Sequence, residues 1–230
     1  MDFFQKILEY DTELFLNLNS YHNDFWDTIM LMITRKETWI PFFAAILYFV
    51  LKNHRGRRWM VVLFIALTIL LSDQISVLLK ETIQRLRPVY NPEIESMVHN
   101  VLRKGGLYGF VSSHAANSFA LLAFMAKLFK NRSFNLLFLF WTIIFCYSRI
   151  YCGVHYPLDI LGGAVLGFAI GTGTFALMLF VEKRFISPGK SWIKKAKLTS
   201  PQSGMIFLVF AVLSATVLIM ASILHKYNYL

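Results

Sequence analysis

A histidine and a carboxylate lie four residues apart, on either side of a predicted helix start. His155 and Asp159 flank Pro157, and proline is favoured in the first turn of a helix. At such a position the two side chains can meet, and a carboxylate bound to one imidazole nitrogen leaves the other nitrogen free to attack. A capping aspartate beside an interfacial histidine fits the same spacing. The pair alone is therefore weak evidence for a nucleophile.

A second polar cluster, Val111-Ser112-Ser113-His114, opens another predicted helix. A helix N-terminus presents free N–H groups and partial positive charge, which suit a phosphate group. Ser112 also fits a simple N-cap that needs no ligand. His114 can donate or accept a proton near neutral pH, whereas Asn117, one turn later, is interpreted as a packing residue.

The third cluster begins at Lys80 and ends at Arg87-Pro88. Residues seven apart return to nearly the same face of a helix, so Lys80 and Arg87 point the same way if the helix continues that far. Pro88 disfavours helical geometry at Arg87. Arg85 is interpreted as an interfacial anchor. Asp73 is predicted to pack between helices or to orient Lys80.

Together with Arg149, these clusters provide a set of groups suited to phosphoryl transfer. Guanidinium groups bind phosphate oxygens in pairs, and a lysine adds a point charge. Such cations stabilise the negative charge of a transferring phosphoryl group. Arg103 and Lys104 fit either contact with a second phosphate or headgroup, or a solvated basic turn.

Composition places these residues in a membrane protein. Hydrophobic residues make up 57% of the 230 positions and charged residues only 16%, too little polar surface for a soluble domain of this size. The apolar residues form blocks near the length that a bilayer requires. We predict an all-α bundle of six transmembrane helices, at about 37–51, 59–80, 112–130, 133–149, 156–181 and 204–225.

The chain reads as one membrane domain, 1–230, in which residues 36–230 form the six-helix core. Residues 1–35 are interrupted by polar side chains and are predicted to form amphipathic helices on the membrane surface, although 24–34 also fits deeper insertion. The first fifteen residues lack the basic start and apolar run of a cleaved signal peptide. Cys146 and Cys152 are expected to be buried thiols.

The basic residues are distributed unevenly between the predicted loops. The 52–58, 127–132 and 182–197 regions carry 13 Lys and Arg residues and one acid, Glu182. The positive-inside rule places these loops in the cytoplasm, so that the 88–111 loop and the 150–155 turn face outward together. The net charge of +10 does not indicate nucleic-acid binding, because the basic residues form no continuous domain.

The three clusters resemble the signature of the type 2 phosphatidic acid phosphatase superfamily, K-x6-R-P, P-S-G-H and S-R-x5-H-x3-D. The first and third patterns have intact spacing, from Lys80 to Arg87 and from Ser148-Arg149 to Asp159. The second departs from the pattern, since Val111 replaces Pro and Ser113 replaces Gly. The added side chain at Ser113 affects how closely a phosphate can approach the backbone.

The resemblance implies a role for each matching residue. His155 attacks phosphorus, Asp159 orients the His155 ring, and His114 protonates the leaving oxygen. The residues implied to bind phosphate are Lys80, Arg87, Ser112 and Arg149, together with the backbone at Ser113. The resemblance implies no metal and no other cofactor.

The expected substrate is a lipid phosphate, and we favour undecaprenyl pyrophosphate at the outer face of a bacterial inner membrane. Phosphatidylglycerophosphate, phosphatidic acid and lipid A remain open as alternatives. A lipid or anion transporter is a non-enzymatic alternative, but a transporter is expected to carry polar residues at mid-bilayer positions in several spans. A non-catalytic lipid-binding protein has no need of the two histidines. The sequence indicates no obligate protein partner.

Overall fold

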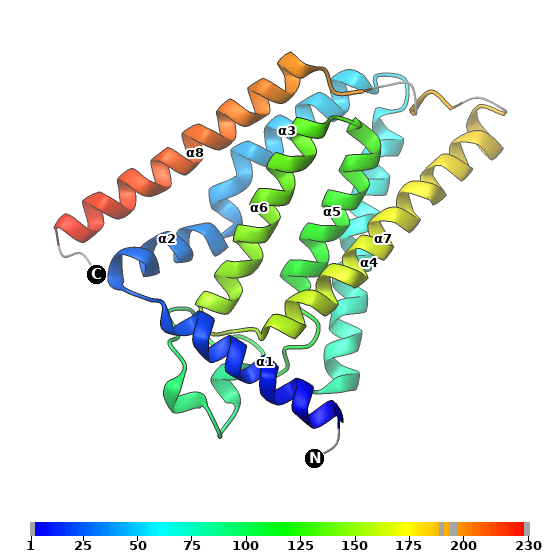
Figure 1. The fold of residues 1–230 in the computed structure, drawn as a ribbon. Coiled ribbons are helices and arrows are strands. Elements are labelled where there is room, and N and C mark those ends of the chain that lie inside the picture. The colour runs from blue at the N-terminus through cyan, green and yellow to red at the C-terminus, as the bar shows by residue number, and fades with distance from the viewer. Residues whose placement is uncertain (1–2, 189–190, 194–196, 228–230) are drawn as a thin grey trace.

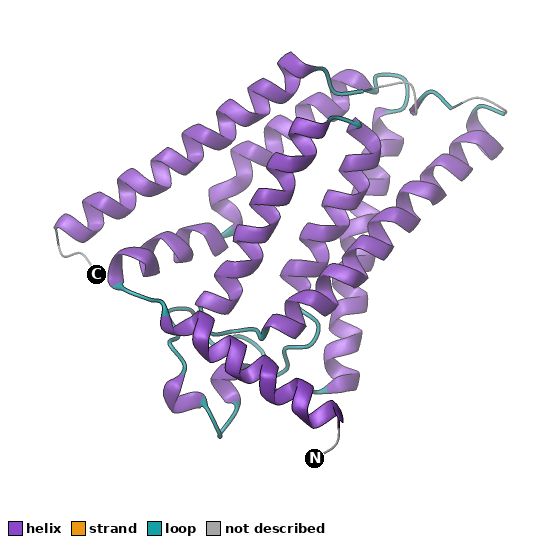
Figure 2. Ribbon diagram, viewed as in Figure 1, coloured by secondary structure: helices purple, strands orange, loops and turns teal. Residues whose placement is uncertain are grey.

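The computed structural model describes residues 3–188, 191–193 and 197–227, and it is helical throughout, with no strand among those residues. Figures 1 and 2 show a bundle of long helices with shorter helices at its edges. The helices are α1 (Phe3–Ser20), α2 (Asp24–Thr34), η1 (Lys36–Trp39), α3 (Ile40–Asn53), α4 (Arg58–Ile83), η2 (Pro88–Tyr90), η3 (Glu95–Met97), α5 (Ser113–Phe129), α6 (Arg132–Tyr151), α7 (Pro157–Val181), η4 (Glu182–Ile186) and α8 (Ser200–Lys226).

Each predicted span corresponds to one of the helices α3 to α8, which confirms the all-helical membrane fold. Four helices are long and apolar enough to cross a bilayer: α4, α6, α7 with η4, and α8. The other two are shorter, at 14 residues for α3 and 17 for α5. The count of six crossings is therefore not confirmed, although α5 lies inside the bundle, packed against α4, α6 and α7.

Small residues allow α5 and α7 to approach closely. A Cβ added at Gly163 would lie 2.6 Å from the Ser112 carbonyl oxygen, and one at Gly167 or Gly171 would collide with the backbone of α5. The glycines recur every four residues and therefore line one face of α7. This close packing fixes the start of α7 beside the start of α5.

The main hydrophobic core is built from residues of η1 and of helices α3 to α8. Trp39 packs against Trp141 and Phe210, with ring centroids 6.0 and 5.5 Å apart. Aromatic contacts of this kind lock large side chains in place. Deep core packing therefore holds the helices that carry the polar clusters.

The N-terminal segment is helical, as predicted, and forms α1 and α2. In Figure 1, α1 crosses below the ends of the long helices, and α2 lies beside α6 and α8. The buried face of α1 carries Asp11, Phe15 and Asn19, which are spaced four residues apart. This helix covers the end of the bundle where the polar clusters meet.

The loops fall into two groups at opposite ends of the bundle. The α3–α4 and α5–α6 connections lie at one end with the end of α7 and the start of α8, and α1 lies with the 84–112 loop and the 152–156 turn at the other (Figure 1). The first group carries the excess of Lys and Arg. The prediction that the 88–111 loop and the 150–155 turn, which carries His155, lie at the same end is therefore correct.

Candidate active site

His155 lies in the turn between α6 and α7, and its ring meets Asp159 as predicted. His155 Nδ1 is 3.2 Å from Asp159 Oδ2, and both side chains are almost completely buried. The same carboxylate oxygen accepts the Tyr156 backbone N–H at 3.0 Å, which caps α7. With its proton on Nδ1, the imidazole presents the lone pair of Nε2, the geometry of an oriented nucleophile.

Three cations lie close enough to this histidine to act on its charge. Arg87, Arg149 and Lys80 all interact electrostatically with His155. Burial, followed by the positive charges of Arg87 and Arg149, holds the pKa of the His155 imidazole well below its usual range. The ring therefore stays neutral and nucleophilic among positive charges that suit an anionic ligand.

Lys80 is held by a serine hydroxyl at the start of α5. Its ammonium donates to Ser113 Oγ, which is also 2.6 Å from Ser76 Oγ. The Ser113 side chain therefore positions Lys80, whereas the sequence suggested only a role for its backbone. The serine that replaces the family's glycine has a structural use here.

Arg87 reaches the site by a different route from the one predicted. The α4 helix ends at Ile83, and Gln84 adopts left-handed geometry with φ of 54°, so Lys80 and Arg87 do not share a helix face. The chain turns back instead, and the Arg87 N–H donates to the Leu107 carbonyl at 3.1 Å. Arg87 Nε also donates to Tyr108 O at 3.1 Å. Loop pairing, rather than helical periodicity, brings this cation to the site.

Arg149 is buried near the end of α6 and is held from the N-terminal segment. Its Nη1 donates to Thr34 Oγ1 at 2.6 Å, while its Nε has no partner among the described residues. A buried guanidinium with an unused N–H can accept an anionic ligand. Thr34 was not identified from the sequence, because a threonine at a helix end has no distinctive pattern.

Ser112 and His114 begin α5 beside these cations. Ser112 is the N-cap, with Oγ 3.5 Å from the Ala115 nitrogen, and its own N–H donates to Asp159 O at 3.0 Å. Ser112 therefore caps α5 and is tied to α7, and the phosphate contact that the resemblance implies for it stays a prediction. His114 lies against Phe145, with ring centroids 5.6 Å apart, and it interacts electrostatically with Arg149 and His155.

The interpretation of Arg85 as an interfacial anchor is wrong. Arg85 bridges two buried carboxylates, with Nη2 2.6 Å from Asp11 Oδ2 and Nη1 3.0 Å from Asp159 Oδ1. Its guanidinium carbon also lies 4.1 Å from the centre of the Tyr156 ring. The contact depends on a turn after α4 and on α1, neither of which the sequence places in space.

The structure also places two other groups of residues that the sequence singled out. Asp73 Oδ1 accepts a weak hydrogen bond from Asn117 Nδ2 at 3.4 Å, which supports packing between α4 and α5 for both residues. Arg103 and Lys104 are exposed in the long loop, with Lys104 5.5 Å from the centre of the Tyr90 ring. The neighbouring Gly105 backs the Arg87 guanidinium, so this turn borders the site.

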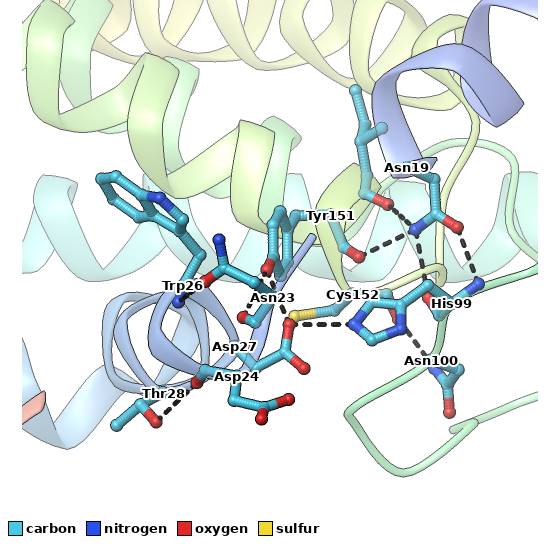
Figure 3. Close-up of polar contacts among 11 residues, drawn as sticks. Asn19, Asn23, Asp24, Trp26, Asp27, Thr28, His99, Asn100, Tyr151 and Cys152 are labelled. Atoms are coloured by element: carbon cyan, nitrogen blue, oxygen red, sulfur yellow. Dashed lines mark hydrogen bonds and ion pairs between the residues drawn. The ribbon is translucent and has the colours of Figure 1, made fainter. Parts of the chain in front are cut away.

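A second polar network ties the N-terminal segment to the end of α6 and to the 84–112 loop, as Figure 3 shows. Asp27 Oδ1 is 2.9 Å from His99 Nε2 and accepts a hydrogen bond from Tyr151 at 2.6 Å. The Asn19 side chain donates to Tyr151 O at 2.8 Å and accepts the His99 N–H at 2.8 Å. Cys152 lies in this region as a buried free thiol, and Cys146 is also buried and free. The expectation of two buried thiols is confirmed.

Comparison with known proteins agrees with this fold. Residues 61–185 match the family model of the PAP2 superfamily. A lipid A 4′-phosphatase of Bacteroides thetaiotaomicron is 43% identical over 165 residues, which are 68% of this chain and 72% of that protein. A lipid A 4′-phosphatase of Porphyromonas gingivalis is 32% identical over 190 residues, 79% of this chain and 78% of that protein. An undecaprenyl-diphosphatase of Bacillus subtilis is 30% identical over 154 residues, 66% of this chain and 75% of that protein.

The fold is also found among solved structures. The crystal structure of a transmembrane PAP2-type phosphatidylglycerolphosphate phosphatase from Bacillus subtilis aligns with a TM-score of 0.56 over 80% of this chain and 90% of that one. The two sequences are 20% identical, so this likeness concerns the fold alone.

The helices and the matched relatives together define a multi-pass membrane protein of the lipid phosphatase class. The chain belongs to the PAP2 superfamily, since the family model covers more than half of it.

Proposed function

We propose that this protein hydrolyses the phosphate ester of a membrane lipid through a phosphohistidine intermediate on His155. The observation that carries the proposal is the buried His155 imidazole, kept neutral and paired with the Asp159 carboxylate, with Arg87, Arg149 and Lys80 close by. A buried imidazole oriented by a carboxylate and placed among cations suits attack on phosphorus.

In the first step, His155 Nε2 forms a bond to phosphorus while the bond from phosphorus to the lipid oxygen breaks. His114 gives its proton to that leaving oxygen, and the three cations stabilise the charge on the other phosphate oxygens. In the second step, His114 takes a proton from water, the hydroxide attacks phosphorus, and the P–N bond breaks. Inorganic phosphate leaves, and the His155 Nδ1–H donates to Asp159 throughout both steps.

The substrate that we propose is lipid A carrying a phosphate at its 4′ position. The two lipid A 4′-phosphatases support this choice through identities of 43% and 32%. Undecaprenyl pyrophosphate, which the sequence favoured, is the second candidate, supported by the 30% identical diphosphatase. The findings therefore favour a substrate that the sequence placed among its alternatives.

We further propose that the protein lies in a bacterial inner membrane with its site facing the periplasm. The excess of Lys and Arg in the loops at the opposite end supports this orientation. We also propose that residues 1–230 act as one domain, because α1 and α2 both contribute contacts to the site.

A substrate panel with purified protein tests the proposal. Wild type in detergent is expected to release phosphate from 4′-phosphorylated lipid A faster than from undecaprenyl pyrophosphate, phosphatidylglycerophosphate or phosphatidic acid. His155→Ala is expected to abolish release, whereas His225→Ala, at an exposed position on α8, is expected to keep it. Full activity of His155→Ala would refute the assigned nucleophile. Preference for another lipid would refute the assigned substrate.

A further inference from the structure

Arg85 joins two carboxylates that are both removed from solvent. The side chain of Asp11 is 2% exposed and that of Asp159 is 0% exposed, and the guanidinium forms an ion pair with each. An arginine is suited to this bridge, because its planar fork presents separate N–H groups to two acceptors. A buried carboxylate without such a partner is costly.

Asp11 reaches this site from α1, which precedes the region matched by the family model. Its Oδ1 accepts the Leu158 backbone N–H at 2.8 Å, at the start of α7. One turn further along α1, Phe15 packs edge-on against Tyr156 at 5.3 Å. The α1 helix therefore contacts Tyr156 and Leu158, the two neighbours of Pro157 in the segment between His155 and Asp159.

The charge of this cluster matters for the chemistry of the histidine. When His155 takes a phosphoryl group its ring becomes cationic, and Asp159 stabilises that cation only if its negative charge is available. Arg85 alone would neutralise Asp159. Asp11 neutralises Arg85 in turn, so two carboxylates and one guanidinium leave a net charge of about −1 beside the ring.

We infer that Asp11 and Arg85 are positioning residues for the reaction, an inference that rests on the phosphatase function proposed above. Arg85 fixes the orientation of the Asp159 carboxylate by bonding Oδ1, which leaves Oδ2 for His155. Asp11 holds Arg85 in that position and balances its charge. Neither residue belongs to the three signature patterns, and neither touches the ring of His155.

Kinetics of four variants test the inference. Asp11→Asn keeps the shape of the side chain but leaves Arg85 uncompensated, so kcat is expected to fall roughly tenfold with little change in KM. Arg85→Gln is expected to move the acid limb of the pH–rate profile to higher pH, because two buried carboxylates then lose their shared cation. Arg85→Lys is expected to recover activity only in part, since an ammonium lacks the fork. Glu13→Gln, at an exposed position on the same helix, is the control and is expected to match wild type.

The pH profile is informative because the other charged groups around the pair stay in place. His155 and Asp159 also face Arg87, and His155 faces Arg149 and Lys80. The double variant Asp11→Asn/Arg85→Gln is expected to be no slower than Arg85→Gln alone, because Asp11 acts through Arg85. Multiplied losses in the double variant, or wild-type kinetics in Asp11→Asn, would overturn the inference.

Two measurements separate this inference from the function on which it rests. If wild type releases phosphate from none of the lipids in the panel, the proposed function fails. If wild type is active and Asp11→Asn keeps its kcat and pH profile, only the positioning role fails. Thermal unfolding in detergent identifies a variant that is merely misfolded, in which case Arg85→Lys and the double variant still decide the matter by the relations given above.

Discussion

Replacing Gly163 by alanine tests whether the approach of α5 and α7 sets the geometry of the site. A Cβ at this position would lie 2.6 Å from Ser112 O and 2.9 Å from Ala115 Cβ. Ordinary contact begins near 3.4 Å, so the helices have to separate by about 0.8 Å. Ser112 caps the helix that carries His114, and its N–H is bonded to Asp159 O, so this separation moves acid and nucleophile apart.

The expected cost has two parts. Overpacking of this kind destabilises a protein by about 1–3 kcal/mol. An alanine in a helix gains about 1 kcal/mol over glycine, which offsets part of that loss. Because a misplacement of about 1 Å at a reaction centre can cost roughly a hundredfold in rate, kcat is expected to fall ten- to a hundredfold.

Gly173→Ala is the matched control, since it lies on the same helix and a Cβ there meets nothing within 4 Å. Thermal unfolding in detergent and phosphate release are measured for both variants. Gly163→Ala is expected to be less stable than Gly173→Ala by about 1–3 kcal/mol, and slower. Equal stability and equal kcat in the two variants would refute the argument that close helix packing positions the site.

Three further predictions concern other parts of the molecule. Thr34→Val removes the hydroxyl that holds Arg149, which is expected to raise KM about tenfold. Thr28→Val is the control, since the Thr28 hydroxyl bonds only its own helix, and equal KM values in the two variants would contradict the role of Thr34. Because the pKa of His155 is held well below about 6.5, kcat/KM is expected to persist as the pH falls through 6.5. The free energy of unfolding of wild type is expected to decline over the same range, since only the unfolded chain protonates this histidine there. Measuring both quantities from about pH 7.5 to 5 checks this, and a loss of kcat/KM near pH 6.5 caused by His155 would contradict it. Glu182 is completely buried and accepts the backbone N–H groups of Trp192 and Ile193 at 2.9 and 3.1 Å. Glu182→Gln is therefore expected to lower the free energy of unfolding by about 1–3 kcal/mol without changing KM. A changed KM would show instead that this end of the bundle is coupled to the site.

The sequence determined the parts of this protein that local chemistry dictates. Long apolar blocks require helices in a bilayer, because only a helix satisfies its own backbone hydrogen bonds there. The spacing of His155 and Asp159 around Pro157 placed both side chains at the start of one helix, where they are found.

The tertiary structure decided which distant groups meet at the site. Arg87 arrives through pairing of the 86–87 segment with 107–108, which helical periodicity does not describe. Arg85 and Asp11 are 74 residues apart, and Thr34 and Arg149 are 115 apart, so these contacts form only when α1 and α2 dock on the bundle. Sequence patterns report the faces of single helices. Turns and docking determine which faces share a pocket, and they depend on packing across the whole chain.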